Sequence, residues 1–302
     1  MGIFGFGTGY EKPGRGVDKN APKKKGFFLF WDIVFHKFAK FLQANSLYFL
    51  TSIIYIVLLY MLSVLLIQPE MFLGLGEEIQ IEGMNAMELA GATAFGFRAM
   101  FVIAVITLWG TGPASAAYAY ITRCFTREEH VWIISDGVDR IKENFKQGMI
   151  VVVVDFILLL LGINALMFYY SFYLSTGSIA WMALCYIAAL MLVVYTMIHP
   201  YIYQIMVTFK CSMGQLYKNA ILLALGKLPM NLLLTALAAV LIFILFTAIN
   251  PAIAIVFSIL IGQCIMKYPM EFYAARVIEK SILRDMKKKT PSAKIEYLEE
   301  DE

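Results

Sequence analysis

The stretch 111–148, TGPASAAYAYITRCFTREEHVWIISDGVDRIKENFKQG, is the only long charged segment in the interior of an otherwise apolar chain. Sixty per cent of the 302 residues are hydrophobic and only 16% are charged, whereas a soluble domain carries about 25% charged residues. Because a soluble fold of this size cannot bury so much apolar surface, the composition predicts a membrane protein. The charged stretch then lies on one side of the membrane, and the apolar segments before and after it cross the membrane from that side and come back as hairpins.

Apolar runs of about 20 residues are long enough for an α-helix to cross a hydrocarbon core roughly 30 Å thick. Six such runs predict an all-α polytopic membrane helical bundle with six transmembrane helices. The predicted spans are 46–67, 96–120, 149–170, 179–209, 231–249 and 252–268. Residues 27–284 then form a single membrane domain between two cytoplasmic tails, 1–26 and 285–302, which are rich in Gly, Pro or charged residues.

The distribution of basic residues predicts the orientation, because translocation of short basic loops is disfavoured. All Lys and Arg residues except Arg98 lie before the first span, in the loops 123–146 and 210–227, or from Lys267 onward. The opposite loop 68–95 carries several glutamates, which favours a solvated outer face over a partner contact. We therefore expect both termini in the cytoplasm. The first span is expected to be retained, because no signal-peptide cleavage pattern is present.

Amphipathic segments precede the odd-numbered spans and predict elbow helices at the membrane surface. In 27–43, polar residues recur at helical spacing and form one narrow stripe. These residues are Asp32, His36, Lys40 and Gln43. Such a helix lies in the membrane interface with its stripe toward water, and a helix packed on a partner protein would use the same stripe. The segments 134–145 and 213–223 show amphipathic spacing before the third and fifth spans.

Lysines and prolines indicate a threefold pattern in the chain. Each elbow ends in a lysine, and each even-numbered span has a proline near its inner end. The lysines are Lys40, Lys146 and Lys227, and the prolines are Pro113, Pro200 and Pro269. This order predicts three copies of an elbow, an outward span and an inward span, in a bundle with a threefold hairpin repeat.

Polar and helix-breaking residues inside the spans predict an intramembrane polar layer. Asp155 and His199 lie roughly 13–17 Å along their helices from cytoplasmic lysines, at 1.5 Å per residue. The predicted layer comprises Pro113, Asp155, His199, Pro200 and Lys267. Because a mid-membrane carboxylate costs about 2.5–3.5 kcal/mol, Asp155 should face the bundle and pair with Lys267 or His199. The layer either lines a cavity, where Asp155 binds a cation or relays a proton, or is a packing feature in which Lys267 pairs with Glu271.

No sequence pattern indicates a catalytic or metal site. The chain lacks HExxH, GxSxG and Walker motifs, its three histidines are isolated, and its four cysteines show no CxxC pairing. We therefore expect no enzymatic activity, catalytic residue, metal or cofactor. Nucleic-acid binding is not expected either, because the basic patches lack interleaved stacking aromatics.

Three separated runs resemble the YesL-like family of bacterial multi-pass membrane proteins. They are PGRGVDKNAPKKKGFFLFWDIVFHKF at 13–38, GPASAAYAYITRCFTREEHVWIISD at 112–136 with ENFKQ at 143–147, and LYKNAILLALGKLPMNLL at 216–233. The resemblance implies the bacterial cytoplasmic membrane, a domain of unknown biochemical function, and genomic neighbourhood with carbohydrate ABC importers. It implies no catalytic residue, and the long loop 68–95 departs from the family pattern.

The leading hypothesis combines this resemblance with the charge concentrated in 111–148. It is a non-enzymatic integral membrane accessory protein that assists a carbohydrate ABC importer and binds permease subunits through its elbows and central loop. The loop residues expected to make the contact are Arg123, Arg127, Glu128, Glu129, His130, Trp132 and Asp136. Taken singly, each also fits a topological role, as an inside anchor or a helix cap. The rival hypothesis is a small-solute or ion transporter that uses the intramembrane layer, and a sensor or assembly factor is a third.

Overall fold

The computed structural model describes residues 26–74 and 83–283, and all regular secondary structure in these two ranges is helical. The first part contains α1 (Gly26–His36), α2 (Phe38–Thr51), α3 (Ile53–Leu66), η1 (Pro69–Phe72) and α5 (Ala86–Leu108). The middle part contains α6 (Pro113–Arg127), α7 (Ile133–Glu143), α8 (Phe145–Thr176), α9 (Ile179–Met206) and α10 (Met213–Gly226). The last part contains α11 (Leu228–Ala248), α12 (Pro251–Phe257), η2 (Ser258–Gly262), α13 (Gln263–Met266), α14 (Tyr268–Ile278) and η3 (Glu279–Leu283). Nearly all of both predicted tails lies outside the described residues, as does 75–82 of the outer loop.

Five helices are long and apolar enough to cross a membrane: α5, α8, α9, α11 and the C-terminal helix Pro251–Ser281. The pair α2–α3 makes a sixth if it is counted as one span, bent by 64° at Ser52. These helices confirm the predicted all-α polytopic membrane bundle.

The second span differs from the predicted range 96–120. α5 already begins at Ala86, where Asn85 and Glu88 form a reciprocal capping box. It ends at Leu108, because the backbone then turns through Gly110 and Gly112 at positive φ, 97° and 70°, before α6 starts. The prediction was therefore wrong at both ends. The segment 86–95 is part of a helix rather than of the outer loop, and 113–120 belongs to a separate, buried helix.

The centre of the molecule is a hub of three inner helices, namely α6, the inner end of α9 and α14. Each of them contacts the other two. Every residue of 197–206 in α9 is buried, as are most residues of α6 and α14. Close approach in lipid needs small side chains, and α6 supplies Ala114, Ala116, Ala117 and Ala119. Pro113 and Pro269 lie in the first turn of α6 and α14, and Pro200 lies inside α9, within its buried segment 197–206.

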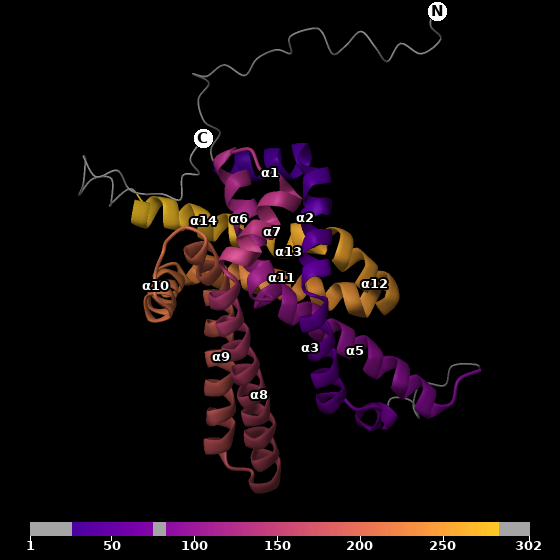
Figure 1. Cartoon of the computed structure of the whole chain (residues 1–302). Helices are drawn as coiled ribbons and strands as arrows, with labels where there is room; N and C mark the ends of the chain where they lie inside the picture. Colours follow the sequence, from indigo (N-terminus) through magenta and orange to yellow (C-terminus); the bar gives the residue numbers. More distant parts are fainter. Residues whose placement is uncertain (1–25, 75–82, 284–302) are drawn as a thin grey trace, which may run out of the picture.

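Three helical hairpins leave this hub (Figure 1). The α3–α5 and α8–α9 hairpins diverge from one another, while α11 and α12 both contact α5 of the first hairpin. The α8–α9 hairpin turns at Gly177, which has φ 66°. Its outer half exposes large apolar side chains, among them Leu161, Leu174, Leu190 and Met191. Because burying apolar surface against hydrocarbon is favourable, these side chains face lipid in a membrane.

Elbow helices precede each hairpin. The predicted first elbow is divided at Lys37 into α1 and the start of α2, and α2 runs on into the predicted first span as far as the bend at Ser52. In contrast, α7 and α10 are single helices before α8 and α11. In α1, Leu29 and Ile33 pack into the core, while Phe28 and Phe35 are exposed on other faces. The order of elbow, hairpin and inner helix thus occurs three times along the described chain.

Candidate functional site

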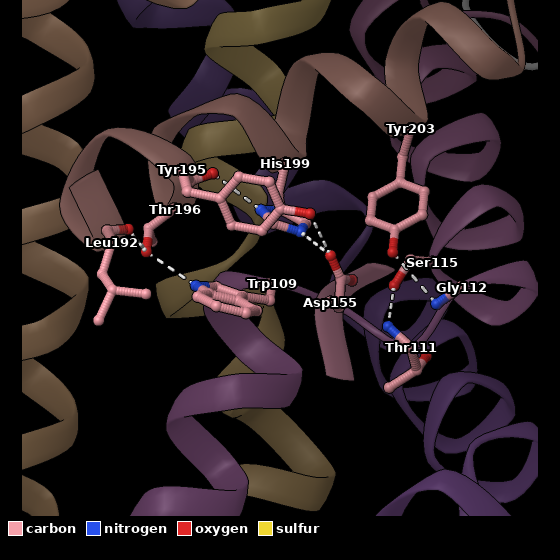
Figure 2. A network of polar contacts seen from close by, with 10 residues as sticks. All are labelled: Trp109, Thr111, Gly112, Ser115, Asp155, Leu192, Tyr195, Thr196, His199 and Tyr203. Carbon is pink, nitrogen blue, oxygen red and sulfur yellow. Dashed lines mark hydrogen bonds and ion pairs between the residues drawn. The ribbon is translucent and has the colours of Figure 1, made fainter. Parts of the chain in front are cut away.

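Asp155 and His199 form a pair between α8 and α9 in the middle of the polar layer (Figure 2). The His199 Nε2 atom lies 2.9 Å from Oδ1 of Asp155, and the Tyr195 hydroxyl donates to the same oxygen at 2.7 Å. The other ring nitrogen, Nδ1, lies 3.0 Å from the carbonyl oxygen of Tyr195. Because a carbonyl oxygen only accepts, Nδ1 carries a proton. The Nε2–Oδ1 bond then needs one further proton, which the ring and the carboxylate share.

Aromatic rings enclose the pair. Trp109 stacks on the His199 ring with centroids 5.4 Å apart, and its Nε1 donates to Thr196 Oγ1 at 2.8 Å. The Tyr195 ring packs edge-on against both. Asp155 is 1% exposed and His199 is 0% exposed. The second carboxylate oxygen, Oδ2 of Asp155, is buried with no hydrogen-bond partner in the described part of the chain.

The backbone amides at the break before α6 are paired with side chains of α6 itself and of α9. The amide of Thr111 donates to Ser115 Oγ, and the amide of Gly112 donates to the Tyr203 hydroxyl, at 2.8 and 3.1 Å. Ser52 Oγ donates to Thr111 Oγ1 at 2.7 Å. The amides of the two residues before Pro113 are thus paired with protein groups.

Lys267 lies on the other side of the layer. Its Nζ donates to the carbonyl oxygen of Thr107 at 3.2 Å, and the rings of Tyr48 and Tyr203 lie 5.7 and 5.9 Å away. Lys267 has no ion-pair partner among the residues that the structure describes, so Asp155 is placed on His199 rather than on this lysine. The alternative ion pair between Lys267 and Glu271 is not formed either.

Gln204 connects the three inner helices, although the sequence analysis did not select it. Its Nε2 donates to the carbonyl oxygen of Ala119 in α6 at 3.0 Å and to Oε2 of Glu271 in α14 at 2.8 Å. Gln204 and Glu271 are both 0% exposed. An amide group inside a predicted span is a usable signal, because a buried amide needs a partner on another helix. Trp109 and Tyr195 gave no such signal, since aromatic residues are common throughout this chain.

Several residues of the central loop have structural contacts. Arg123 Nη1 donates to the carbonyl oxygen of Val207 and to Thr208 Oγ1, at 2.7 and 3.1 Å, and so joins α6 to the end of α9. Burial, followed by the neighbouring Arg127, lowers the pKa of Arg123, which stays protonated. Asp136 Oδ2 accepts from the backbone amide of Trp132 at 2.8 Å, at the start of α7.

Other residues of this loop are presented to the outside. Arg127 pairs with Glu129 at 3.7 Å, and Glu128 ends α6 at φ 62°. The rings of His130 and Trp132 pack edge-on with centroids 5.0 Å apart, and Trp132 is 69% exposed. We refer to the exposed residues Glu128, Glu129, His130, Trp132 and Ile134 as the Trp132 surface.

The two candidate sites offer different chemistry. The buried pair holds a shared proton out of contact with solvent, whereas the Trp132 surface offers an aromatic ring and two carboxylates to a partner. Within the described ranges, no group of three or more His, Cys, Asp or Glu residues is arranged to hold a metal ion. No family model, curated protein or solved structure matches this chain.

Proposed function

We propose that this protein is a non-enzymatic membrane accessory protein that holds a partner protein through the Trp132 surface. The observation that carries this proposal is the exposed Trp132 ring, which packs on His130 and stands on a backbone held by the bond from the Trp132 amide to Asp136. Exposed tryptophans held in one position are frequent centres of protein interfaces, because little side-chain entropy is lost on binding. Glu128 and Glu129 beside the ring disfavour insertion into anionic lipid.

The partner that we propose is a permease subunit of a bacterial carbohydrate ABC importer. Two observations support it. The sequence resembles the YesL-like family in three runs, one of which, 112–136, contains the Trp132 surface. The basic residues around this surface, including Arg123 and Arg127, favour a cytoplasmic position by the positive-inside rule, with both termini on that side.

Affinity purification of the tagged protein from native membranes in mild detergent tests this proposal. We expect co-purification of permease subunits with the wild type and a loss of roughly thirtyfold or more in affinity for Trp132→Ala, as for a hot-spot residue. The control for loss of a tryptophan is Trp181→Ala, because Trp181 packs on Phe168 and Phe172 near the turn of the α8–α9 hairpin, away from the Trp132 surface. This variant should leave co-purification unchanged. Recovery of the protein alone, even after cross-linking, would count against the accessory role.

A small-solute or ion transporter that uses the polar layer is the second candidate. The observation in its favour is the unpartnered Oδ2 of Asp155 beside the shared proton of the pair. Because both side chains are closed off from solvent, α8 and α9 would have to separate during each cycle. Flux into liposomes by the purified protein, abolished by Asp155→Asn, would support transport, and the absence of flux for common cations and protons would remove this candidate.

A further inference from the structure

A groove of about 790 Å³ lies between the α7–α8 junction and the linker from α9 to α10. One wall carries Lys142, Glu143 and Lys146, and the other carries Lys210 and Ser212. The groove is separate from the Trp132 surface and from the Asp155–His199 pair, none of whose residues line it.

The groove carries an excess of positive charge. Its charged lining residues are the four cations Arg140, Lys142, Lys146 and Lys210 and the single acid Glu143. Arg140 and Glu143 pair at 2.6 Å, and Lys142 lies 3.6 Å from Asp139. Lys146 and Lys210 are exposed and have no ion-pair partner among the described residues. These two ammonium groups are therefore available to an anion.

A hydrogen bond fixes the two walls relative to one another. Gln147, next to Lys146, donates through Nε2 to the carbonyl oxygen of Cys211, next to Lys210, at 2.8 Å. Burial raises the pKa of the Cys211 thiol, so this side chain adds no negative charge to the groove. The bond holds the backbone on either side of the groove so that both lysines lie on its lining.

The groove lies where α8 and α9 enter the apolar part of their hairpin. Lys146, Ile150, Val153 and Ile157 are spaced i, i+4, i+7 and i+11, which places them on one face of α8. The three apolar side chains of this face are 47%, 54% and 50% exposed. A cationic groove therefore continues directly into an exposed apolar strip.

We propose that this groove binds the phosphate of an anionic phospholipid between Lys146 and Lys210, with an acyl chain lying along Ile150, Val153 and Ile157. A soluble phosphate would use the two lysines but not the apolar strip. The continuity of groove and strip therefore favours a lipid as the source of the phosphate.

Native mass spectrometry of the purified full-length protein, titrated with phosphatidylglycerol or with zwitterionic phosphatidylcholine, tests this site. We expect the wild type to retain phosphatidylglycerol preferentially. In the double variant Lys146→Ala/Lys210→Ala, the affinity for phosphatidylglycerol should fall roughly 10- to 30-fold. Each lysine near a headgroup contributes a similar share of the binding free energy, and this variant removes two. The matched control is Lys218→Ala/Lys280→Ala, which removes two exposed lysines that do not line the groove.

A conservative pair, Lys146→Arg/Lys210→Arg, should retain the binding and so separates loss of charge from loss of fold. Equal retention of phosphatidylglycerol by the two alanine pairs would overturn the proposed site. Displacement of the lipid by millimolar inorganic phosphate would overturn the assignment to a lipid, because a headgroup anchored by an acyl chain resists such competition.

Discussion

At the Asp155 side chain, one carboxylate oxygen is in contact with two polar groups and the other with none among the described residues. A negative charge on Asp155 therefore depends on His199 as its cationic partner. Removing one partner of a buried ion pair leaves an uncompensated charge, which commonly costs about 3–5 kcal/mol. A neutral amide in place of the carboxylate keeps an oxygen that accepts from Tyr195.

We therefore predict that His199→Ala destabilises the protein more than Asp155→Asn does, by at least about 2 kcal/mol. The measurement is the loss of tertiary structure with rising temperature in detergent, followed by tryptophan fluorescence, since Trp109 stacks on His199. Equal losses in the two variants would mean that the pair holds no charge separation.

Gln204 gives a second residue-scale prediction. Gln204→Leu removes the donor to Glu271 and leaves that buried acid without a hydrogen-bond partner among the described residues, so a loss of about 2–4 kcal/mol is expected. Gln263→Leu is the matched control, because Gln263 Nε2 donates only to the neutral hydroxyl of Thr107 at 2.9 Å, and about 1 kcal/mol is expected. The double variant Gln204→Leu/Glu271→Leu should recover part of the loss. A Gln204 variant as stable as the control would show that the three inner helices do not depend on this amide.

At the scale of elements, the turn between α5 and α6 decides how closely α6 approaches α8. A Cβ on Gly112 would lie 2.5 Å from Val152 Cγ2 and 2.6 Å from the carbonyl oxygen of Gly148, and one on Gly148 would lie 2.6 Å from the nitrogen of Pro113. Gly112, before α6, and Gly148, in α8, thus let the backbones of the two helices touch. Hydropathy alone did not indicate it, which is why a single span was predicted across this turn.

Gly112→Ala is expected to cost about 3–5 kcal/mol, because the strain of φ 70° and the steric overlap both oppose it. Gly177→Ala has nearly the same φ, 66°, but nothing within 4 Å of the new Cβ, and should cost only about 1–2 kcal/mol. Thermal midpoints and the yield of monodisperse protein compare the two. Similar losses would leave backbone strain alone as the cause and contradict the close approach of α6 and α8.

At the scale of the whole molecule, the charges on the two ends of the α8–α9 hairpin predict its orientation in the membrane. The α7–α8 junction carries Arg140, Lys142 and Lys146, whereas the turn at Gly177 has no basic residue nearby. The positive-inside rule therefore predicts that the junction lies in the cytoplasm and the turn outside.

Single cysteines in a background without native cysteines test this orientation. A membrane-impermeant maleimide should label Thr176→Cys, near the turn, in intact cells, and should label Ser135→Cys, in α7, only after permeabilisation. Both positions are exposed in the structure, so a difference in labelling reports the side of the membrane. The reverse pattern would invert the proposed topology and remove the Trp132 surface from the cytoplasm.

The sequence predicted the class of fold and the number of apolar segments, because length and hydropathy alone decide whether a helix can cross a bilayer. It missed the start of α5, since Glu88 was counted with an acidic loop although it caps a helix with Asn85. Counting residues along the spans placed Asp155 and His199 at similar heights on their helices, and the structure pairs them. It left open the choice between His199 and Lys267 as partner, because that depends on how the helices are rotated and packed.

The contacts of the α8–α9 hairpin have a mechanical consequence. Near the hub its two helices are joined by Asp155 and His199, in the middle Leu192 packs onto Gly162, and near the turn Trp181 packs against Phe168 and Phe172. Because contacts at three heights couple α8 and α9, we expect the hairpin to tilt as one rigid unit. Because α9 continues into the buried segment 197–206, a force applied at the turn of the hairpin should reach the inner helices.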